Sequence, residues 1–103
     1  MSEFSQVTVV REANIFFDGG VTSRTLIFPD GRKKTLGIMQ PGEYEFTTHS
    51  AELMEILAGD LDVQLPGADD WQTFAAGESF EVAAHARFGL RVRAVTDYCC
   101  SFL

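Results

Sequence analysis

Basic side chains are the candidates for binding a small anion, such as phosphate, in this chain of 103 residues. Arginine carries a planar fork of N–H donors that fits two oxygens of one anion. Arg24 stands beside Ser23 inside a predicted strand, where an idle charge is costly, so it is the first choice. The segment 32–34 (Arg-Lys-Lys) follows a Pro-Asp-Gly turn and is better explained as a solvated surface. The other basic candidates are Arg87, Arg91 and Arg93.

Carboxylates and histidines are the candidates for proton transfer and for metal binding. Glu43 and Glu45 share one face of a predicted strand, with aromatic residues on the opposite face. His49 and His85 are the only histidines. A metal site in a protein usually needs at least three protein ligands, so His49 with Glu52 makes a poor one, and we expect no metal. His85 falls in a predicted turn, where a lone histidine is most simply a surface residue.

Short runs of β-branched and aromatic residues, each closed by turn residues, must position these side chains. The pattern predicts strands at 7–10, 21–28, 36–39, 44–46, 50–57, 61–65, 79–82, 88–92 and 98–103. Gly59-Asp60 predicts a hairpin between the strands on either side of it. In the strand at 88–92, Phe88 and every second residue after it share one face, and Arg91 lies on the other. We expect an all-β fold with little or no helix.

Composition restricts the classes of function. The chain is 46 % hydrophobic and 22 % charged, enough for one globular domain with one core. The formal net charge of −7 repels phosphate backbones, so we expect no nucleic acid partner. No apolar run approaches the roughly 20 residues that span a bilayer, and no secretory signal is visible, so we expect no membrane partner. Cys99 and Cys100 are neighbours that point to opposite faces of a strand, which predicts free thiols and a cytoplasmic protein.

Two glycine-punctuated blocks carry a resemblance to a known fold. The first block covers residues 41–59 and contains the string Gly-Glu-Tyr-Glu-Phe, and the second covers residues 77–88. Their spacing resembles the two sequence motifs of the cupins, small β-barrels that usually hold a metal. The resemblance implies one cupin-type jelly-roll β-barrel over residues 1–103, with residues 1–13 as an N-terminal strand or arm that precedes the barrel.

This sequence lacks histidines at the metal-binding positions of the cupin pattern. The histidines of the cupin pattern fall here at or near Thr48, Ser50 and Phe88, so the barrel is expected without its metal. Glu52 stands where the pattern has its metal-binding glutamate. A carboxylate there would be satisfied by local donors, raised in pKa as a candidate acid, or used to bind sugar hydroxyls. Ala83 replaces the usual proline of the second block, which should loosen that turn.

An ordered set of residues resembles one family more specifically. These residues are Asn14, Phe17, Val21, Ser23, Gly37, Met39, Gly42-Glu43-Tyr44-Glu45-Phe46, Glu52, Met54, Gly59, Leu65-Pro66, Asp70-Trp71, Ala76-Gly77, Phe80, Val82, Phe88 and Tyr98. The set is similar to that of the pyrimidine/purine nucleoside phosphorylase family of small bacterial cupins, over nearly the whole chain after Ala13. The resemblance implies a homodimeric, metal-independent enzyme. It would cleave purine and pyrimidine nucleosides with inorganic phosphate as co-substrate, releasing the free base and ribose 1-phosphate.

Phosphorolysis needs donors for phosphate, an acid or hydrogen-bonding group beside the base, and a site that excludes water. The resemblance implies that Glu43 and Glu52 are catalytic. The expected substrate-binding residues are Ser23, Arg24, Tyr44, Phe46, Met54, Phe80, His85 and Phe88. Aromatic side chains can stack on purines and pyrimidines alike, although most of them must also pack the core.

Two other functions compete with this hypothesis. A non-catalytic cupin could bind a sugar or nucleotide as a sensor or subunit, and the lack of an obvious acid–base pair favours it. A metal-dependent cupin oxygenase or isomerase is the other alternative, and Thr48, Ser50 and Phe88 at the ligand positions oppose it.

Overall fold

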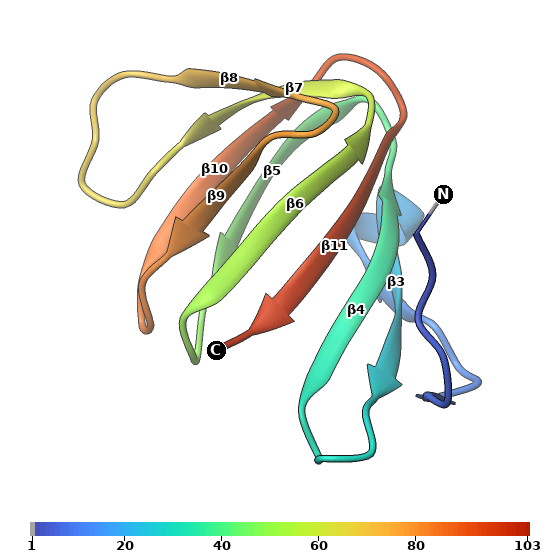
Figure 1. Ribbon diagram of the computed structural model, residues 1–103. Helices are drawn as coiled ribbons and strands as arrows, with labels where there is room; N and C mark the ends of the chain where they lie inside the picture. Colours follow the sequence, from blue (N-terminus) through green and yellow to red (C-terminus); the bar gives the residue numbers. More distant parts are fainter. Residues whose placement is uncertain (1) are drawn as a thin grey trace.

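A computed structural model describes residues 2–103 and shows two antiparallel β-sheets that pack face to face (Figure 1). The strands are β1 (Thr8–Val9), β2 (Asn14–Phe16), β3 (Val21–Ile27), β4 (Lys33–Met39), β5 (Gly42–Thr47), β6 (Glu52–Ala58), β7 (Asp60–Gln64), β8 (Gln72–Ala75), β9 (Ser79–Val82), β10 (Arg87–Val92) and β11 (Thr96–Phe102). One sheet has the order β1-β3-β4-β11-β6-β9, with β2 also paired to β3, and the other has the order β5-β10-β7-β8. The all-β expectation is confirmed, since the only helical element in the described residues is the 3₁₀ turn η1 (Phe17–Gly19).

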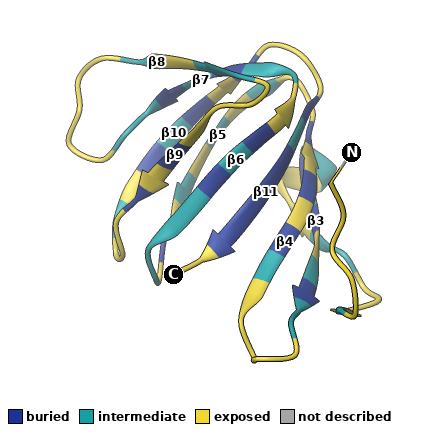
Figure 2. Ribbon diagram, viewed as in Figure 1, coloured by how far each residue is buried: buried dark blue, intermediate teal, exposed yellow. Residues whose placement is uncertain are grey.

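Alternation along the strands builds one core between the sheets (Figure 2). In β10, Phe88, Leu90 and Val92 are buried and Arg91 is exposed, as the period of two predicts. The larger sheet contributes side chains such as Ile56 to the same cluster. No helix of the described residues is long and apolar enough to cross a membrane.

The predicted hairpin at Gly59-Asp60 is wrong. β6 pairs with β11 and β9 in one sheet, whereas β7 pairs with β10 and β8 in the other. The chain therefore crosses between the sheets at Gly59. This glycine has a φ of 93°, and a Cβ atom there would lie 2.6 Å from both the carbonyl oxygen of Val95 and the hydroxyl of Thr96. Glycine marks the crossing because no side chain fits against that segment.

The N-terminal segment extends the larger sheet. β1 and β2 both pair with β3, and the register places Asn14 opposite Ser23. The strand pattern did not predict β2 or β8, which are three and four residues long. After β2 the chain turns through η1, where Phe17 and Asp18 both have positive φ. This turn leaves the ring of Phe16 beside that of Phe46, on the other sheet.

Candidate active site

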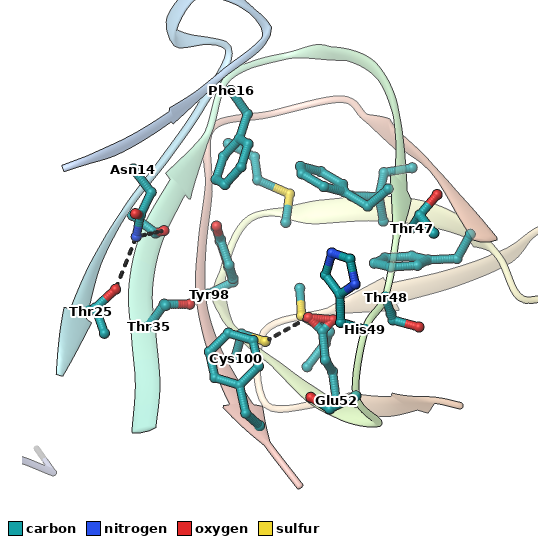
Figure 3. Close-up of a pocket in the computed structure, with 18 residues that line it drawn as sticks. Asn14, Phe16, Thr25, Thr35, Thr47, Thr48, His49, Glu52, Tyr98 and Cys100 are labelled. Atoms are coloured by element: carbon teal, nitrogen blue, oxygen red, sulfur yellow. Dashed lines mark hydrogen bonds between the residues drawn. The ribbon is translucent and has the colours of Figure 1, made fainter. Parts of the chain in front are cut away.

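A cavity of about 450 Å³ lies between the two sheets, at the end of the barrel where β5 leads into β6. Figure 3 shows its lining. Polar side chains come mainly from the inner face of the larger sheet, and aromatic side chains come from β2, β5, β10 and the end of β11. The cavity therefore has a polar floor and an aromatic wall.

The polar floor begins with three side chains from β2 and β3. Asn14 Nδ2 donates to Ser23 Oγ at 3.2 Å and to Thr25 Oγ1 at 3.1 Å. Asn14 and Thr25 are labelled in Figure 3, which shows the Thr25 bond on the far left of the cavity. Ser23 and Thr25 point inward because residues two apart share one face of a strand. Thr35 on β4 is paired with Thr25 and continues the floor toward β11.

Tyr98 reaches the same cluster across β4. Its backbone partner on β4 is Gly37, and Gly37 is in turn paired with Ser23 on β3. A Cβ atom at Gly37 would lie 2.7 Å from the Tyr98 ring, so the absence of a side chain lets the phenol pass over β4. Burial raises the pKa of Tyr98 to about 12, although a hydrogen bond from Ser23 opposes the shift. The phenol therefore keeps its proton at neutral pH.

Glu52 is the only carboxylate that lines the cavity in the described part of the chain. The Cys100 thiol donates to its Oε1 at 3.4 Å (Figure 3). Burial raises the pKa of Glu52, while the Cys100 hydrogen bond and the nearby His49 act in the opposite direction. Burial and the Glu52 charge raise the pKa of Cys100 as well, so the thiol stays protonated and acts as a donor. A half-buried carboxyl with a raised pKa can serve as a general acid.

Aromatic rings form the wall that faces the floor. The rings of Phe46 and Phe88 lie stacked with centroids 6.1 Å apart, and Phe16 meets Phe46 edge-on at 5.4 Å. Phe16 is 40 % exposed, so its ring is available at the mouth of the cavity. Such a wall can hold a flat heterocycle without reading its polar edge.

The positions of the cupin metal ligands do not fit a metal. Thr48 is buried and its hydroxyl donates to the carbonyl oxygen of Ala83 at 2.7 Å while it accepts from the Ala86 amide at 3.0 Å. This hydroxyl therefore ties the loop after β5 to the loop before β10. Phe88 is apolar and buried in the core. No group of three or more His, Cys, Asp or Glu side chains in residues 2–103 is arranged to hold a metal ion.

Half of the predicted site residues meet in this cavity. They are Ser23, Phe46, Glu52, Met54 and Phe88. Tyr44 and Phe80 point into the interior but away from the cavity: the Tyr44 hydroxyl donates to the Gln40 carbonyl at 2.7 Å, and Phe80 packs between Phe74 and Phe88. His85 is exposed in the turn before β10 and does not line the cavity, although we expected it to bind substrate.

Glu43 and Arg24 lie on outer faces. Glu43 is exposed and forms an ion pair with Arg91 at 3.2 Å, because the period of two along β5 turns the carboxylates outward when Phe46 turns inward. The Arg91 guanidinium also stacks on Trp71, 3.9 Å from the ring centre. Arg24 is exposed because its neighbour Ser23 occupies the inner face. Neither predicted residue can reach the cavity from the outside of its strand.

The other basic candidates also point away from the cavity. Arg87 and Arg93 pair with surface carboxylates, Arg87 with Glu45 at 3.6 Å. Arg32 pairs with Asp30 in the exposed turn, as the solvated-surface interpretation predicted. No lysine or arginine of residues 2–103 lines the cavity. The expectation that a basic side chain inside the pocket holds an anion has no candidate in this structure.

The sequence interpretation missed most of the polar floor. Thr25, Thr35 and Cys100 line the cavity, as do Asn14 and Tyr98, which entered only through the family likeness. One available signal was overlooked. In the predicted strand at 21–28, the face that starts with buried Val21 continues with Ser23 and Thr25, and polar residues on an inward face need partners.

Two sheets that enclose a cavity, with the larger sheet as its floor, form a small cupin-type fold. An RmlC-like cupin from Shewanella frigidimarina superposes with a TM-score of 0.71 at 19 % identity, covering 98 % of this chain and 86 % of that chain. The model of the pyrimidine/purine nucleoside phosphorylase family matches residues 11–102. The chain belongs to this enzyme family, which confirms the likeness found in the sequence.

Relatives match over the full length. Proteins named pyrimidine/purine nucleoside phosphorylase from Geotalea uraniireducens and Geobacter sulfurreducens are 70 % and 64 % identical over 103 residues, 100 % of this chain and 99 % of each relative. A crystal structure of a protein of unknown function from Acinetobacter sp. ADP1 has a TM-score of 0.95 and 37 % identity, and the match covers 98 % of both chains.

Proposed function

We propose that the cavity catalyses phosphorolysis of purine and pyrimidine nucleosides to free base and α-D-ribose 1-phosphate, without a metal. One observation carries this proposal: a single cavity combines an aromatic wall, a half-buried carboxyl group with a raised pKa and a neutral polar floor. These are the three components that the reaction needs. The family membership supports the same activity.

The reaction exchanges one bond for another at the anomeric carbon. A phosphate oxygen attacks this carbon as the bond to the base nitrogen breaks, and the bonding electrons leave with the base. Glu52, in its protonated form, donates a proton to the departing base, and the proton that phosphate loses on forming the sugar phosphate restores the carboxyl group. Cys100 holds Glu52 in place through its thiol hydrogen bond.

Broad specificity follows from how the wall would hold the base. Phe46 and Phe16 offer ring surfaces, and stacking depends on the π face that purines and pyrimidines both have. A site that relies on stacking discriminates weakly between heterocycles, because a polar site gains its selectivity from the penalty of unpaired hydrogen-bonding groups.

Metal independence is supported by the chemistry of the side chains at the expected ligand positions. The Thr48 hydroxyl is already bonded to the backbone of a neighbouring loop, and Phe88 offers no ligand atom. His49 is the only histidine that lines the cavity among the described residues, and with Glu52 it supplies two ligands, too few for a catalytic site.

The proposal extends to a homodimer formed through the outer face of the larger sheet. Leu36 and Ile38 on β4 are 37 % and 36 % exposed there. A row across this face runs from Arg24 through Leu36 and Cys99 to Glu55, so an apolar centre is flanked by opposite charges. A two-fold axis through the centre would bring Arg24 of one protomer to Glu55 of the partner subunit.

The free thiols, Cys99 among them, support a reducing, cytoplasmic setting.

Base release from a panel of nucleosides, with and without phosphate and in the presence of a chelator, tests the activity. Release that requires phosphate and survives the chelator is the expected result. Release without phosphate would mean hydrolysis, and loss of activity in the chelator, restored by added metal, would refute metal independence. Saturable nucleoside binding without any turnover would instead favour a sensor or a non-catalytic subunit.

A further inference from the structure

The proposed reaction needs a bound phosphate, yet the described lining of the cavity contains no lysine or arginine. Phosphate must therefore be held by neutral donors or by His49. Neutral donors are sufficient when they are preorganised in a partly dehydrated site, since a hydrogen bond to a charged group contributes a factor of about 10 to 100 in affinity. The neutral groups that can do so are those whose hydrogens are not already used in hydrogen bonds within the chain.

Hydroxyl groups with unused hydrogens lie at the β2–β3 end of the floor. The Asn14 amide uses both of its N–H hydrogens, one on the Ser23 oxygen and one on the Thr25 oxygen. The Thr25 hydroxyl accepts from Asn14, and among residues 2–103 it donates no hydrogen bond of its own, so its hydrogen is left for another acceptor. Ser23 and Tyr98 lie in one row across Gly37, and a hydrogen bond between their hydroxyls would use only one of the two hydrogens, so at least one of these hydrogens is also unused.

The direction of this small network is fixed by its geometry. Asn14 donates at both ends, so each hydroxyl that accepts from it becomes a better donor through polarisation. The Tyr98 phenol keeps its proton. Because Gly37 has no side chain, the phenol ring can lie over β4 and reach the cluster. At least two O–H donors therefore converge on one end of the cavity without a partner. This arrangement fits an anion that offers several acceptor oxygens.

We propose that Asn14, Ser23, Thr25 and Tyr98 form the phosphate subsite and bind phosphate through neutral O–H donors that Asn14 orients. The inference rests on the proposed phosphorolysis. Asn14 is a positioning residue in this subsite, because it acts through the two hydroxyl groups. Thr25 and the Ser23–Tyr98 pair supply the hydrogens that contact phosphate.

The place of the subsite agrees with the chemistry. Thr25 is paired with Thr35, and Thr35 with Cys100, the residue that binds Glu52. Because neighbouring strands lie about 4.8 Å apart, the donor cluster on β3 is about 10 Å from β11. A ribose ring fits between them. Phosphate would then approach the sugar from the β3 side, while Glu52 meets the base from the β6 side, as an in-line displacement requires.

Asn14→Asp is the decisive variant. It keeps the size of the side chain but replaces the NH2 group, which carries both N–H donors, with an acceptor oxygen. The two hydroxyl groups then turn toward residue 14, and the variant adds a negative charge. We expect the KM for phosphate to rise at least 100-fold, with a change of less than about fivefold in the KM for the nucleoside. Thr25→Val removes one donor at nearly constant volume, and we expect a rise of about tenfold to 100-fold.

Two matched controls locate the phosphate. Arg32→Gln removes a basic side chain in the exposed turn between β3 and β4 and should leave the KM for phosphate unchanged. His49→Asn tests the one other cavity residue that can carry a positive charge. A large rise in the KM for phosphate in either control, with little change in the Asn14 and Thr25 variants, would overturn the proposal. Far-ultraviolet circular dichroism and thermal melting show whether each variant is folded, and Thr25→Val carries the test if Asn14→Asp is not.

Ionic strength gives an independent readout. A phosphate held by an arginine binds more weakly as salt is added. With neutral donors and a net protein charge of −7, screening by potassium chloride should leave the KM for phosphate unchanged or lower it. A KM that rises steeply with salt would refute the neutral subsite.

Phosphate binding without turnover separates this inference from the proposed activity. Titration of the wild-type protein with inorganic phosphate, followed by calorimetry, should show binding that Thr25→Val weakens. If wild-type protein turns over nucleosides with phosphate but the variants keep the wild-type KM and affinity, the subsite is wrong and the phosphorolysis stands. If no nucleoside is cleaved, the proposed function fails. Absence of phosphate binding in the same titration would then end the subsite proposal too.

Discussion

Replacement of Glu52 by glutamine tests the proposed acid most directly. Glutamine has nearly the same shape and keeps an oxygen that can accept the Cys100 thiol hydrogen bond, which spans 3.4 Å in the wild-type protein. It cannot give a proton to the departing base. A general acid contributes about 10²- to 10⁴-fold, so kcat should fall by that factor, equal to about 3–5 kcal/mol of transition-state stabilisation.

The assay compares two kinds of leaving group. Uridine or inosine needs protonation of the base, whereas 4-nitrophenyl β-D-riboside releases a phenolate that leaves without a proton. Glu52→Gln should lose activity toward the nucleosides and retain most of it toward the nitrophenyl riboside. Glu81→Gln, an exposed carboxylate on the outer face of β9, is the matched control and should change neither rate. Equal losses on both substrates would refute the acid role of Glu52.

The pH dependence has a defined sign. Burial raises the pKa of Glu52 above its ordinary value of 4.5, so the acid form persists to higher pH than for an exposed glutamate, and kcat should fall as pH rises through the raised pKa. The folded chain holds this proton more tightly than the unfolded chain. Its contribution to stability is therefore fully present below the ordinary pKa and is lost as pH rises through the raised one. Glu52→Gln should melt higher than the wild type at pH 8, with no difference near pH 4.

Three further changes follow from the same geometry. Gly37→Ala places a methyl group against both the Thr22 carbonyl oxygen and the Tyr98 ring, so we expect a loss of about 1–3 kcal/mol of stability by denaturant unfolding. Displacement of the ring should also raise the KM for phosphate, and an unchanged KM would contradict the position of the phenol over β4. Phe46→Leu keeps an apolar wall but loses the stacking surface, so the KM of purine and pyrimidine nucleosides alike should rise about 5- to 30-fold, equal to about 1–2 kcal/mol of binding, while the KM for phosphate does not. Ile38→Lys should convert the proposed dimer to a monomer in sedimentation velocity, and a dimer that persists would place the interface elsewhere.

Strand periodicity predicted the local arrangement well because it depends on neighbours in the chain. The burial of Phe88 and the outward position of Arg91 both follow from a period of two. The strand before Gly59 was also correct, although its length and composition are compatible with a short helix. What failed was the pairing of that strand with the next one. A hairpin and a crossing between sheets use the same turn residues, and only contacts with the distant segment at Val95 distinguish them.

The site was harder to predict than the strands because it depends on pairs of residues that are far apart in sequence. Asn14 and Thr25 are joined across a strand pair, and Cys100 meets Glu52 from a strand that pairs 48 positions away. No spacing of residues in the sequence predicts these contacts. Arg24 was chosen because a charge inside a strand looks costly, but the cost disappears when the charge lies on the outer face.

The absence of lysine and arginine from the described cavity lining and the acid role of Glu52 support each other. A cation close to Glu52 would favour the ionised carboxylate and lower its pKa, so the acid form would be lost at a lower pH. Neutral donors avoid this effect. A bound phosphate adds negative charge to the same cavity, and since like charges disfavour ionisation, it should raise the pKa of Glu52 further. Bound phosphate would thus favour the protonated form of Glu52, which is the form that donates a proton to the base. If this coupling operates, saturating phosphate must shift the alkaline limb of the pH–rate profile to higher pH, and the shift must be absent in Glu52→Gln.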